Sequence, residues 1–300
     1  MTKLLICDPV APEAVEKIRR LGVEVDVQDS ITADELAEVI GEYDGMVVRS
    51  RTKVREPLID RAEKLQAVIR GGVGLDNIDV AYAREKGIQV LNTPAASSNA
   101  VAELALGMMM ALARNIARGD ASMKAGKWEK KALKGTELSG KTLGVIGYGR
   151  IGQLLGEKAR ALGMEVIASD PYVQHEDVVP LQELLERADY ISLHLPHTDE
   201  THHLISTQEF ERMKHGVYLV DAARGGVVDE AALYESLLDG HVAGAALDVY
   251  SQEPPEKEEL RKLVEHPHVV ATPHIGAGTR EAQERVGDEI VRLVKEYLTE

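Results

Sequence analysis

Short runs rich in β-branched residues alternate with amphipathic helical stretches along almost the whole 300-residue chain. This alternation is typical of β-α-β units, which build parallel sheets covered by helices. Only 4% of the residues are aromatic, so the core must consist mostly of Ala, Val, Leu and Ile, as expected for an α/β fold. The expected strands are residues 3–7, 23–27, 45–49, 67–70 and 88–91, and then 142–146, 165–168, 190–194, 217–220, 243–247 and 269–271.

These strands fall into two series, and a chain of this length commonly divides into two domains. The first series has helices expected at residues 12–21, 33–41 and 79–86, and it ends before a long helix expected from Asn99 to about Arg118. The second series begins after a charged loop at residues 124–134. A final amphipathic helix is expected at residues 280–297, and the alternation alone does not assign it to either domain.

A glycine-rich motif, Gly147-Tyr148-Gly149-Arg150-Ile151-Gly152, lies between the expected strand 142–146 and a helix expected over residues 150–162. In that context the first glycine allows a tight turn, the second lets the backbone approach a pyrophosphate, and the third lets helix and strand pack closely. The next strand leads to Asp170, and a carboxylate there accepts hydrogen bonds from ribose hydroxyls and repels a 2′-phosphate. The motif predicts a Rossmann domain that prefers NAD to NADP.

A second segment, Gly135 to Thr142, formally matches the phosphate-binding pattern G-x-x-x-x-G-K-[ST]. That pattern binds phosphate only between a strand and a following helix, because the helix N-terminus and the loop amides hold the phosphates together. Here the segment precedes a strand. We therefore interpret it as a turn and not as a nucleoside-triphosphate site.

Three successive strands of the second series are followed by side chains suited to acid-base chemistry: Arg224, Glu253 and His274. Ligands of open α/β sheets bind at the carboxyl ends of the strands. Hydride transfer from a 2-hydroxy acid needs a cation for the carboxylate and a base that titrates near neutrality, often a histidine tuned by a carboxylate. These three residues are the predicted catalytic set.

The composition limits the other possible functions. A formal net charge of −15 argues against a nucleic-acid partner. The one cysteine, Cys7, lies in an apolar run, which predicts a buried small side chain and a reducing compartment. No signal segment is evident, and the most apolar stretch, residues 101–113, is too short to span a bilayer. We expect a cytoplasmic protein that does not bind membranes.

Three histidine pairs invite a metal hypothesis: His194 with His197, His202 with His203, and His266 with His268. No cysteine lies near them, and the predicted chemistry needs no metal. We therefore predict no metal site. Arg51 and Lys53 are interpreted as solvated charges.

Further segments carry a resemblance to a known family. They are Val47-Val48-Arg49-Ser50, Gly72-Val73-Gly74-Leu75-Asp76-Asn77-Ile78-Asp79, Asn92-Thr93-Pro94, residues 121–129 and Gly135-Thr136-Glu137-Leu138. With the motifs above, they make the chain similar over essentially its whole length to the D-isomer-specific 2-hydroxyacid dehydrogenases. Residues 121–129 and the Gly135 segment resemble the phosphoglycerate-specific members in particular.

The resemblance implies a Rossmann NAD-binding domain, residues 98–279, inserted in a flavodoxin-like substrate domain formed by residues 1–97 and 280–300. It implies that Arg224 binds the substrate carboxylate, that His274 exchanges the hydroxyl proton, and that Glu253 orients the imidazole and raises its pKa. The implied cofactor contacts are Gly147, Gly149, Arg150, Ile151, Gly152, Asp170, His194, Leu195, Ala222, Ala223, Arg224, Asp248, His274, Gly276 and Ala277. The implied substrate contacts are Arg49, Ser50, Arg70, Gly72, Val73, Gly74 and Asn92, with Lys130 from a neighbouring subunit.

The activity that the resemblance implies is NAD-dependent oxidation of D-3-phosphoglycerate, the entry to serine synthesis, by a homodimer joined through the long helix and residues 124–134. The serine-binding regulatory domain of many such enzymes is not expected in this chain. Two alternatives remain open: a reductase of glyoxylate, hydroxypyruvate or another small 2-keto acid, and an NAD-sensing corepressor that binds peptides. Comparable activity on unphosphorylated substrates would favour the first, and NADH binding without turnover would favour the second.

Overall fold

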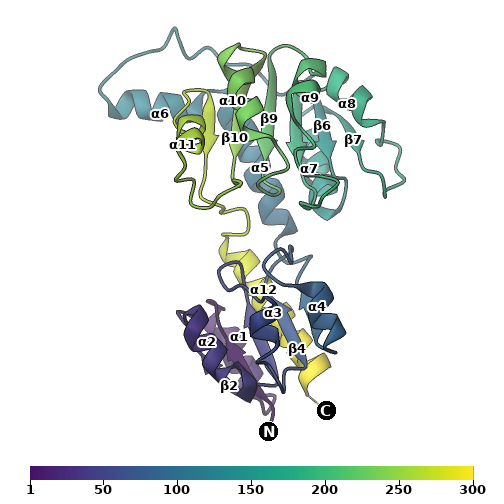
Figure 1. The fold of residues 1–300 in the computed structure, drawn as a ribbon. Helices are drawn as coiled ribbons and strands as arrows, with labels where there is room; N and C mark the ends of the chain where they lie inside the picture. Colours follow the sequence, from purple (N-terminus) through teal and green to yellow (C-terminus); the bar gives the residue numbers. More distant parts are fainter. Residues whose placement is uncertain (300) are drawn as a thin grey trace. The chain divides into compact units, whose positions relative to one another are not determined.

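The computed structural model describes residues 1–299, and Glu300, the last residue of the predicted substrate domain, lies outside the described residues. The chain divides into two compact units (Figure 1). Unit 1 consists of Met1–Ser97 and the segment that begins at Ala277, and unit 2 consists of Ser98–Gly276. The final helix, α12 (Arg280–Leu298), therefore belongs to unit 1.

Unit 1 contains a five-stranded parallel sheet in the order β2-β1-β3-β4-β5, which is the flavodoxin-like order. Its strands are β1 (Lys3–Ile6), β2 (Glu24–Val27), β3 (Gly45–Val48), β4 (Ala67–Arg70) and β5 (Gln89–Asn92). Its other helices are α1 (Pro12–Arg19), α2 (Ala33–Val39), the 3-10 turn η1 (Ile40–Glu42), α3 (Glu56–Ile59) and α4 (Val80–Glu85).

Successive side chains of a strand point to opposite faces of the sheet, and the core of unit 1 follows that alternation. Leu4 and Ile6 of β1 pack against α1 and α12, whereas Leu5 packs against α2, η1, α3 and α4. Both faces are thus covered, as a parallel sheet requires. Cys7 is fully buried, and burial raises the pKa of its thiol to about 12, so the predicted buried small side chain is confirmed.

Unit 2 contains a six-stranded parallel sheet in the order β11-β10-β9-β8-β6-β7. Helices α5 and α7 cover one face, and α8, α9, α10 and α11 cover the other. The strands are β6 (Thr142–Ile146), β7 (Glu165–Ser169), β8 (Tyr190–Leu193), β9 (Val217–Asp221), β10 (Val242–Leu247) and β11 (Val269–Ala271). The helices are α5 (Ser98–Ala113), α6 (Ile116–Lys124), α7 (Arg150–Ala161), α8 (Leu181–Arg187), α9 (Thr207–Arg212), α10 (Glu230–Leu238) and α11 (Glu258–Val264).

In each sheet, successive strands are added first towards one side and then towards the other, and the point where this order reverses is the switch point. Ligands of open α/β sheets bind at the carboxyl ends of the strands there. In unit 2 the reversal lies between β6 and β8, so Gly147 and His194 mark it. In unit 1 it lies between β1 and β3, so Asp8 and Arg49 mark it. The predicted fold class, two doubly wound parallel-sheet domains, is confirmed.

The predicted uninterrupted helix from Asn99 to about Arg118 is wrong. The segment is two helices, α5 and α6, with a 65° bend at Arg114–Asn115. Asn115 has a φ of 52°, a left-handed conformation that asparagine adopts more readily than most residues. The amide of Thr136 donates to the carbonyl of Ala113 at 2.8 Å, which satisfies a terminal carbonyl of α5.

The same contact accounts for Gly135, because a Cβ at that position would overlap the carbonyl oxygen of Ala113. Residues 135–141 lead into β6, so this glycine segment lacks the strand-to-helix context of a phosphate loop. Within residues 1–299, no single helix is both long and apolar enough to cross a membrane. Helices α5 and α6 meet that length and composition only when they are counted together.

Candidate functional site

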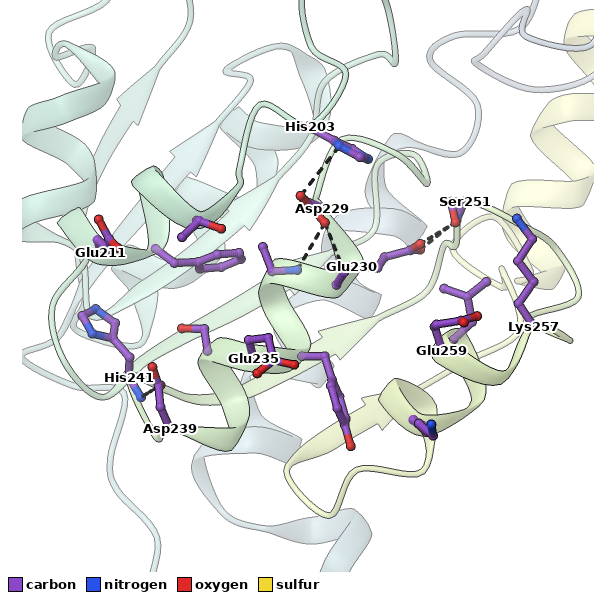
Figure 2. Close-up of a pocket in the computed structure, with 18 residues that line it drawn as sticks. His203, Glu211, Asp229, Glu230, Glu235, Asp239, His241, Ser251, Lys257 and Glu259 are labelled. Atoms are coloured by element: carbon purple, nitrogen blue, oxygen red, sulfur yellow. Dashed lines mark hydrogen bonds and ion pairs between the residues drawn. The ribbon is translucent and has the colours of Figure 1, made fainter.

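A surface pocket of unit 2 lies among α9, α10 and α11 (Figure 2). Its walls include Phe210, Tyr234 and Leu260, with several carboxylates around them. None of the residues predicted for catalysis, cofactor or substrate lines it within the described part of the chain. The predicted catalytic residues lie instead at the carboxyl ends of the strands.

The glycine loop after β6 is built as the motif predicts. Gly147 has a φ of +89°, and a Cβ there would lie 2.5 Å from the carbonyl oxygen of His194. A Cβ at Gly152 would overlap the carbonyl of Gly147 and lie 2.9 Å from Cγ1 of Val145, so glycine lets α7 pack on the strand. At Gly149 no heavy atom of the described residues, other than those of Gly149 and its two chain neighbours, lies within 4 Å of the Cβ position. The backbone at the N-terminus of α7 is thus open to a ligand.

Asp170, directly after β7, connects the next strand end to this loop. Its Oδ2 accepts a hydrogen bond from the amide of Tyr148 at 2.8 Å, and its Oδ1 accepts one from the amide of Tyr172 at 2.9 Å. Each carboxylate oxygen has a second acceptor position, so ribose hydroxyls could still donate to it. Asp170 therefore has a second role that the sequence did not indicate, which is to hold the glycine loop.

His194 follows β8 at the point where the chain reverses. Its Nε2 lies 2.9 Å from Oγ of Ser192, and its buried Nδ1 has no hydrogen-bond partner among residues 1–299. Burial lowers the pKa of the ring to about 4, so it is neutral at physiological pH. Leu195, Ala222 and Ala223 stand at neighbouring strand ends, and their contacts with a cofactor stay predictions.

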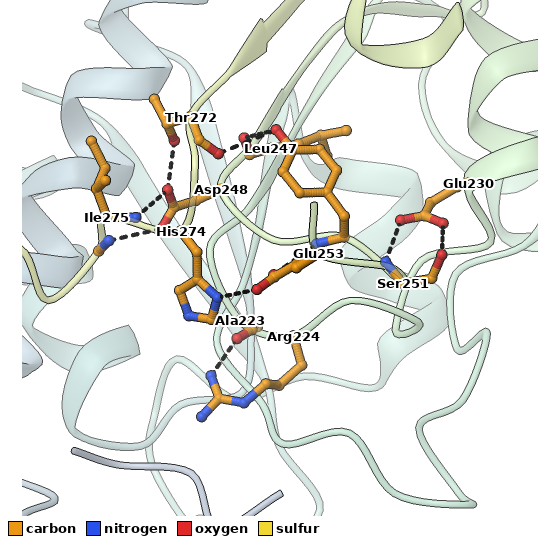
Figure 3. A network of polar contacts seen from close by, with 12 residues as sticks. Ala223, Arg224, Glu230, Leu247, Asp248, Ser251, Glu253, Thr272, His274 and Ile275 are labelled. Atoms are coloured by element: carbon orange, nitrogen blue, oxygen red, sulfur yellow. Dashed lines mark hydrogen bonds and ion pairs between the residues drawn. The ribbon is translucent and has the colours of Figure 1, made fainter. Parts of the chain in front are cut away.

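The predicted acid-base pair is formed (Figure 3). Nδ1 of His274 lies 2.8 Å from Oε2 of Glu253, and Oε1 of Glu253 accepts from the amide of Tyr250 at 3.2 Å. The hydrogen bond to Glu253 raises the pKa of His274, against the effect of burial. Burial acts most strongly on Glu253 and would raise its pKa, but the hydrogen bonds from His274 and the Tyr250 amide, together with the charges of His274 and Arg224, outweigh burial and lower the pKa. The pair therefore favours an imidazolium beside a carboxylate and leaves Nε2 for proton exchange.

Asp248, at the end of β10, holds the loop that carries His274. Its Oδ1 accepts from the hydroxyl of Thr272 at 2.6 Å and the amide of Ile275 at 2.8 Å, and its Oδ2 accepts from the amide of Gly276 at 2.8 Å. His274 has a φ of 52°, a left-handed conformation that costs a non-glycine residue roughly 1–2 kcal/mol. The bonds to Asp248 hold the backbone on the C-terminal side of this residue. The predicted cofactor contact of Asp248 stays a prediction.

Arg224 completes the set at the end of β9. Its Nη1 donates to the carbonyl of Ala223 at 2.5 Å. Its charge lowers the pKa of Glu253 and opposes protonation of His274, so the guanidinium lies within electrostatic range of both. Unit 2 thus brings together the three residues that were predicted from separate strand ends (Figure 3).

The switch point of unit 1 is organised by a residue that the sequence did not single out. Asp8 is 1% exposed, and it accepts from the amide of Arg49 at 2.5 Å, from Nε of Arg51 at 2.9 Å and from the hydroxyl of Thr52 at 3.1 Å. Arg51 is 48% exposed, so its charge is solvated as predicted, but the prediction missed its ion pair with Asp8, a buried carboxylate that needs donors and a counter-charge. On the other side, the side-chain Nδ2 of Asn77 donates to the carbonyls of Arg49 and Thr52, both at 2.7 Å.

The predicted substrate residues of unit 1 stand along one edge of its sheet. Val48 pairs with Arg70 and Arg70 pairs with Asn92, so Arg49, Arg70 and Asn92 are at the carboxyl ends of three adjacent strands. The side-chain Nδ2 of Asn92 donates to the carbonyl of Val73 at 2.6 Å and so shapes the Gly72–Gly74 loop. Ser50 is exposed on unit 1, and Lys130 is exposed on the segment between α6 and β6 of unit 2.

A family model for the NAD-binding domain of the D-isomer specific 2-hydroxyacid dehydrogenases matches residues 106–276, more than half of the chain. The chain is also 50% identical to a hydroxypyruvate reductase of Thermotoga maritima over 291 residues, which cover 96% of this chain and 95% of that protein. The chain belongs to the D-isomer specific 2-hydroxyacid dehydrogenase family.

Two other members of this family are similar over nearly the whole chain. A D-3-phosphoglycerate dehydrogenase of Methanocaldococcus jannaschii is 47% identical over an alignment of 306 positions, which covers 99% of this chain and 58% of that enzyme. The chain thus spans little more than half the length of that relative. The structure of a D-lactate dehydrogenase of Aquifex aeolicus, solved with NAD and lactic acid, has a TM-score of 0.88 at 31% identity and covers 99% of this chain and 95% of that one. The predicted family and the NAD cofactor are confirmed.

The residues of the glycine loop fit this cofactor. A pyrophosphate fits the open backbone at Gly149 and the N-terminus of the 12-residue helix α7. A ribose fits the carboxylate of Asp170. Two of the histidines weighed as metal ligands, His197 and His202, bond each other at 3.1 Å. Within residues 1–299, no three His, Cys, Asp or Glu side chains are grouped as a metal site requires.

We predict that Glu253→Gln moves the titration of His274 to lower pH. The carboxylate stabilises the protonated ring, so its removal favours the neutral form. The measurement is the ring Cε1 proton NMR signal as a function of pH, assigned by its loss in His274→Ala. Glu256→Gln is the control, because it removes the same charge three residues along the segment. An unchanged midpoint in Glu253→Gln would contradict the pairing.

Proposed function

We propose that the chain catalyses the NAD-dependent oxidation of D-3-phosphoglycerate to 3-phosphohydroxypyruvate, the entry to serine synthesis. The observation that carries the dehydrogenase chemistry is the 2.8 Å contact between His274 and Glu253, with Arg224 at the adjacent strand end. A base, a carboxylate that tunes it and a cation are the groups that oxidation of a 2-hydroxy acid requires.

In this mechanism Arg224 binds the substrate carboxylate and the oxygen on C2, which holds the C2–H bond in one orientation. Nε2 of His274 removes the hydroxyl proton as the C2–O bond becomes a carbonyl, and Glu253 stabilises the imidazolium that results. The glycine loop and Asp170 would hold NAD, which would supply the acceptor for the hydride that leaves C2. In the reverse direction His274 returns the proton to the carbonyl oxygen. Asp170 disfavours the 2′-phosphate of NADP by charge repulsion.

Cationic side chains support a phosphorylated substrate. Arg49 lies at the switch point of unit 1, and its guanidinium donates to two neutral oxygens, the carbonyl of Pro9 at 3.4 Å and Oε1 of Gln283. An arginine bonded to neutral groups keeps its charge for an anion. In a chain of net charge −15, such cations at a ligand-binding edge favour a phosphate site. We assign the phosphate to Arg49 and Arg70, with Lys130 contributed by a second subunit.

The second candidate is reduction of hydroxypyruvate, the same chemistry without the phosphate. It is favoured by the 50% identity to a hydroxypyruvate reductase, which this chain matches over 95% of its length. The catalytic residues would be the same in both functions. The two functions differ only in whether the arginines of unit 1 bind a substrate phosphate.

Steady-state kinetics with D-3-phosphoglycerate and D-glycerate separates these functions. We predict that Arg49→Ala raises the KM for D-3-phosphoglycerate about 10- to 100-fold, as expected when a charge-assisted hydrogen bond is lost, and leaves D-glycerate turnover nearly unchanged. Arg55→Ala is the control, because Arg55 is exposed and bonds the carbonyl of Asp76 at 2.8 Å. Equal activity on both substrates, unchanged by Arg49→Ala, would contradict the phosphoglycerate assignment and favour hydroxypyruvate.

We also propose a homodimer that covers α5, α6 and the turn after them. Four large apolar side chains are exposed along that segment: Met110 at 37%, Ile116 at 55%, Met123 at 57% and Trp128 at 78%. Exposed apolar groups that gather on one region mark an interface. Sedimentation equilibrium should give twice the chain mass of 32.7 kDa, and Ile116→Glu should shift it towards the monomer. Leu238→Glu, at an exposed apolar side chain elsewhere, is the control. A monomeric wild-type chain would contradict the proposal.

A further inference from the structure

The segment that carries Glu253 passes from the protein interior to the surface at Ser251, two residues before Glu253. Val249 and Tyr250 are buried, at 3% and 6% exposure, and the hydroxyl of Tyr250 donates to the carbonyls of Leu247 and Thr272. Ser251 and Glu253 are both exposed. An exposed segment orders its side chains poorly unless polar contacts fix it. The geometry of the acid-base pair therefore depends on what holds Ser251.

Glu230, the first residue of α10, makes that contact with both of its carboxylate oxygens (Figure 3). Its Oε1 accepts the amide of Ser251 at 2.8 Å, and its Oε2 accepts the hydroxyl of Ser251. The contact joins residues 21 positions apart and lies two residues from Glu253. Hydrogen bonds to a charged acceptor are shorter and stronger than those between neutral groups.

Glu230 itself stands on fixed backbone. Asp229 caps α10, with its Oδ1 accepting the amides of Ala231 and Ala232, each at 3.2 Å. Its Oδ2 accepts the hydroxyl of Ser206 at 2.9 Å, and α10 buries Leu233 and Leu237 against the sheet. Figure 2 shows Asp229 and Glu230 at the start of the helix, with Ser251 beside Glu230. The support for Ser251 thus comes from a rigid element.

Gly225 restrains Ser251 through packing. A Cβ at Gly225 would overlap the carbonyl of Tyr250 and lie 2.5 Å from the amide nitrogen of Ser251. The backbone after Arg224 is therefore in direct contact with the peptide that Glu230 binds. A displacement of Ser251 would change the position of Glu253 relative to both His274 and Arg224.

We propose that Glu230 is a positioning residue for the acid-base pair: by holding Ser251, it fixes the segment that carries Glu253 and so keeps Glu253 on His274. This role rests on the proposed function, in which His274 exchanges the substrate proton. Glu230 touches neither substrate nor the reacting atoms, and it acts only through Ser251 and Glu253.

The test compares four variants with the wild-type enzyme. Glu230→Ala removes both bonds to Ser251, Glu230→Gln removes the charge but keeps one acceptor, and Ser251→Ala removes only the hydroxyl bond. Glu235→Gln is the control, because Glu235 also lines the pocket on α10, and its carboxylate has no hydrogen bond or ion pair among residues 1–299. Three quantities are measured: kcat, the KM for NAD, and the midpoint of the His274 NMR titration without substrate.

The charged groups that act on the His274 ring are Glu253, Asp248 and Arg224, so a loosened Glu253 shifts the balance towards the neutral ring. We expect Glu230→Ala to lower kcat about tenfold with the KM for NAD unchanged, as for a small misplacement of a catalytic group. The His274 midpoint should move to lower pH, towards that of Glu253→Gln. Glu230→Gln and Ser251→Ala should give smaller changes in the same direction.

Equal effects of Glu230→Ala and Glu230→Gln would overturn the proposal, because they would show that the charge alone matters. A His274 titration that is no different in Glu230→Ala from that in Glu235→Gln would also overturn it. Failure of the dehydrogenase chemistry on which the proposal rests looks different: the wild-type enzyme would then turn over neither phosphorylated nor unphosphorylated substrate. The NMR titration would still test the contact in that case.

Discussion

The candidate site depends most on the hydrogen bonds that the buried carboxylate of Asp248 accepts. A charge that is 1% exposed is tolerated only where hydrogen bonds compensate its loss of water, and here one hydroxyl and two amides do so. Those donors come from both sides of His274. The hydrogen bonds to Asp248 therefore fix the backbone around His274, the proposed base. The imidazole is then held in a defined position, where Glu253 can pair with it.

Both units present functional groups at the carboxyl ends of their strands, and some of these groups lie where the strand order reverses. In unit 2 this places the glycine loop against the backbone of His194, and a side chain at Gly147 would not fit there. In unit 1 the same topology places Arg49 beside the buried Asp8. In unit 1 the buried carboxylate lies at the switch point itself, whereas in unit 2 the buried Asp248 follows β10 and holds the loop after β11. The sheet topology determines where the functional loops lie, and the buried carboxylate holds its loop in place through hydrogen bonds.

Much of this was predictable from sequence because it depends on local patterns. The strand β6, the glycines of the loop after it and the order of Arg224, Glu253 and His274 all follow from spacing along the chain. The ion pair of Arg51 with Asp8 joins residues 43 positions apart, and neither residue type nor spacing indicates it. The contact of Glu230 with Ser251 and the left-handed turn at Asn115 are likewise set by tertiary packing. Such contacts arise only when distant segments meet.

The central claim is that His274 is the acid-base group of an NAD-dependent dehydrogenase and does not bind the cofactor tightly. The most direct test measures NADH binding by fluorescence and reduction of 3-phosphohydroxypyruvate by absorbance in the wild-type chain and in His274→Ala. We predict that His274→Ala loses at least about 100-fold in kcat, the typical contribution of a general acid, and keeps nearly the wild-type affinity for NADH. Wild-type turnover in His274→Ala, or loss of NADH binding together with turnover, would contradict it.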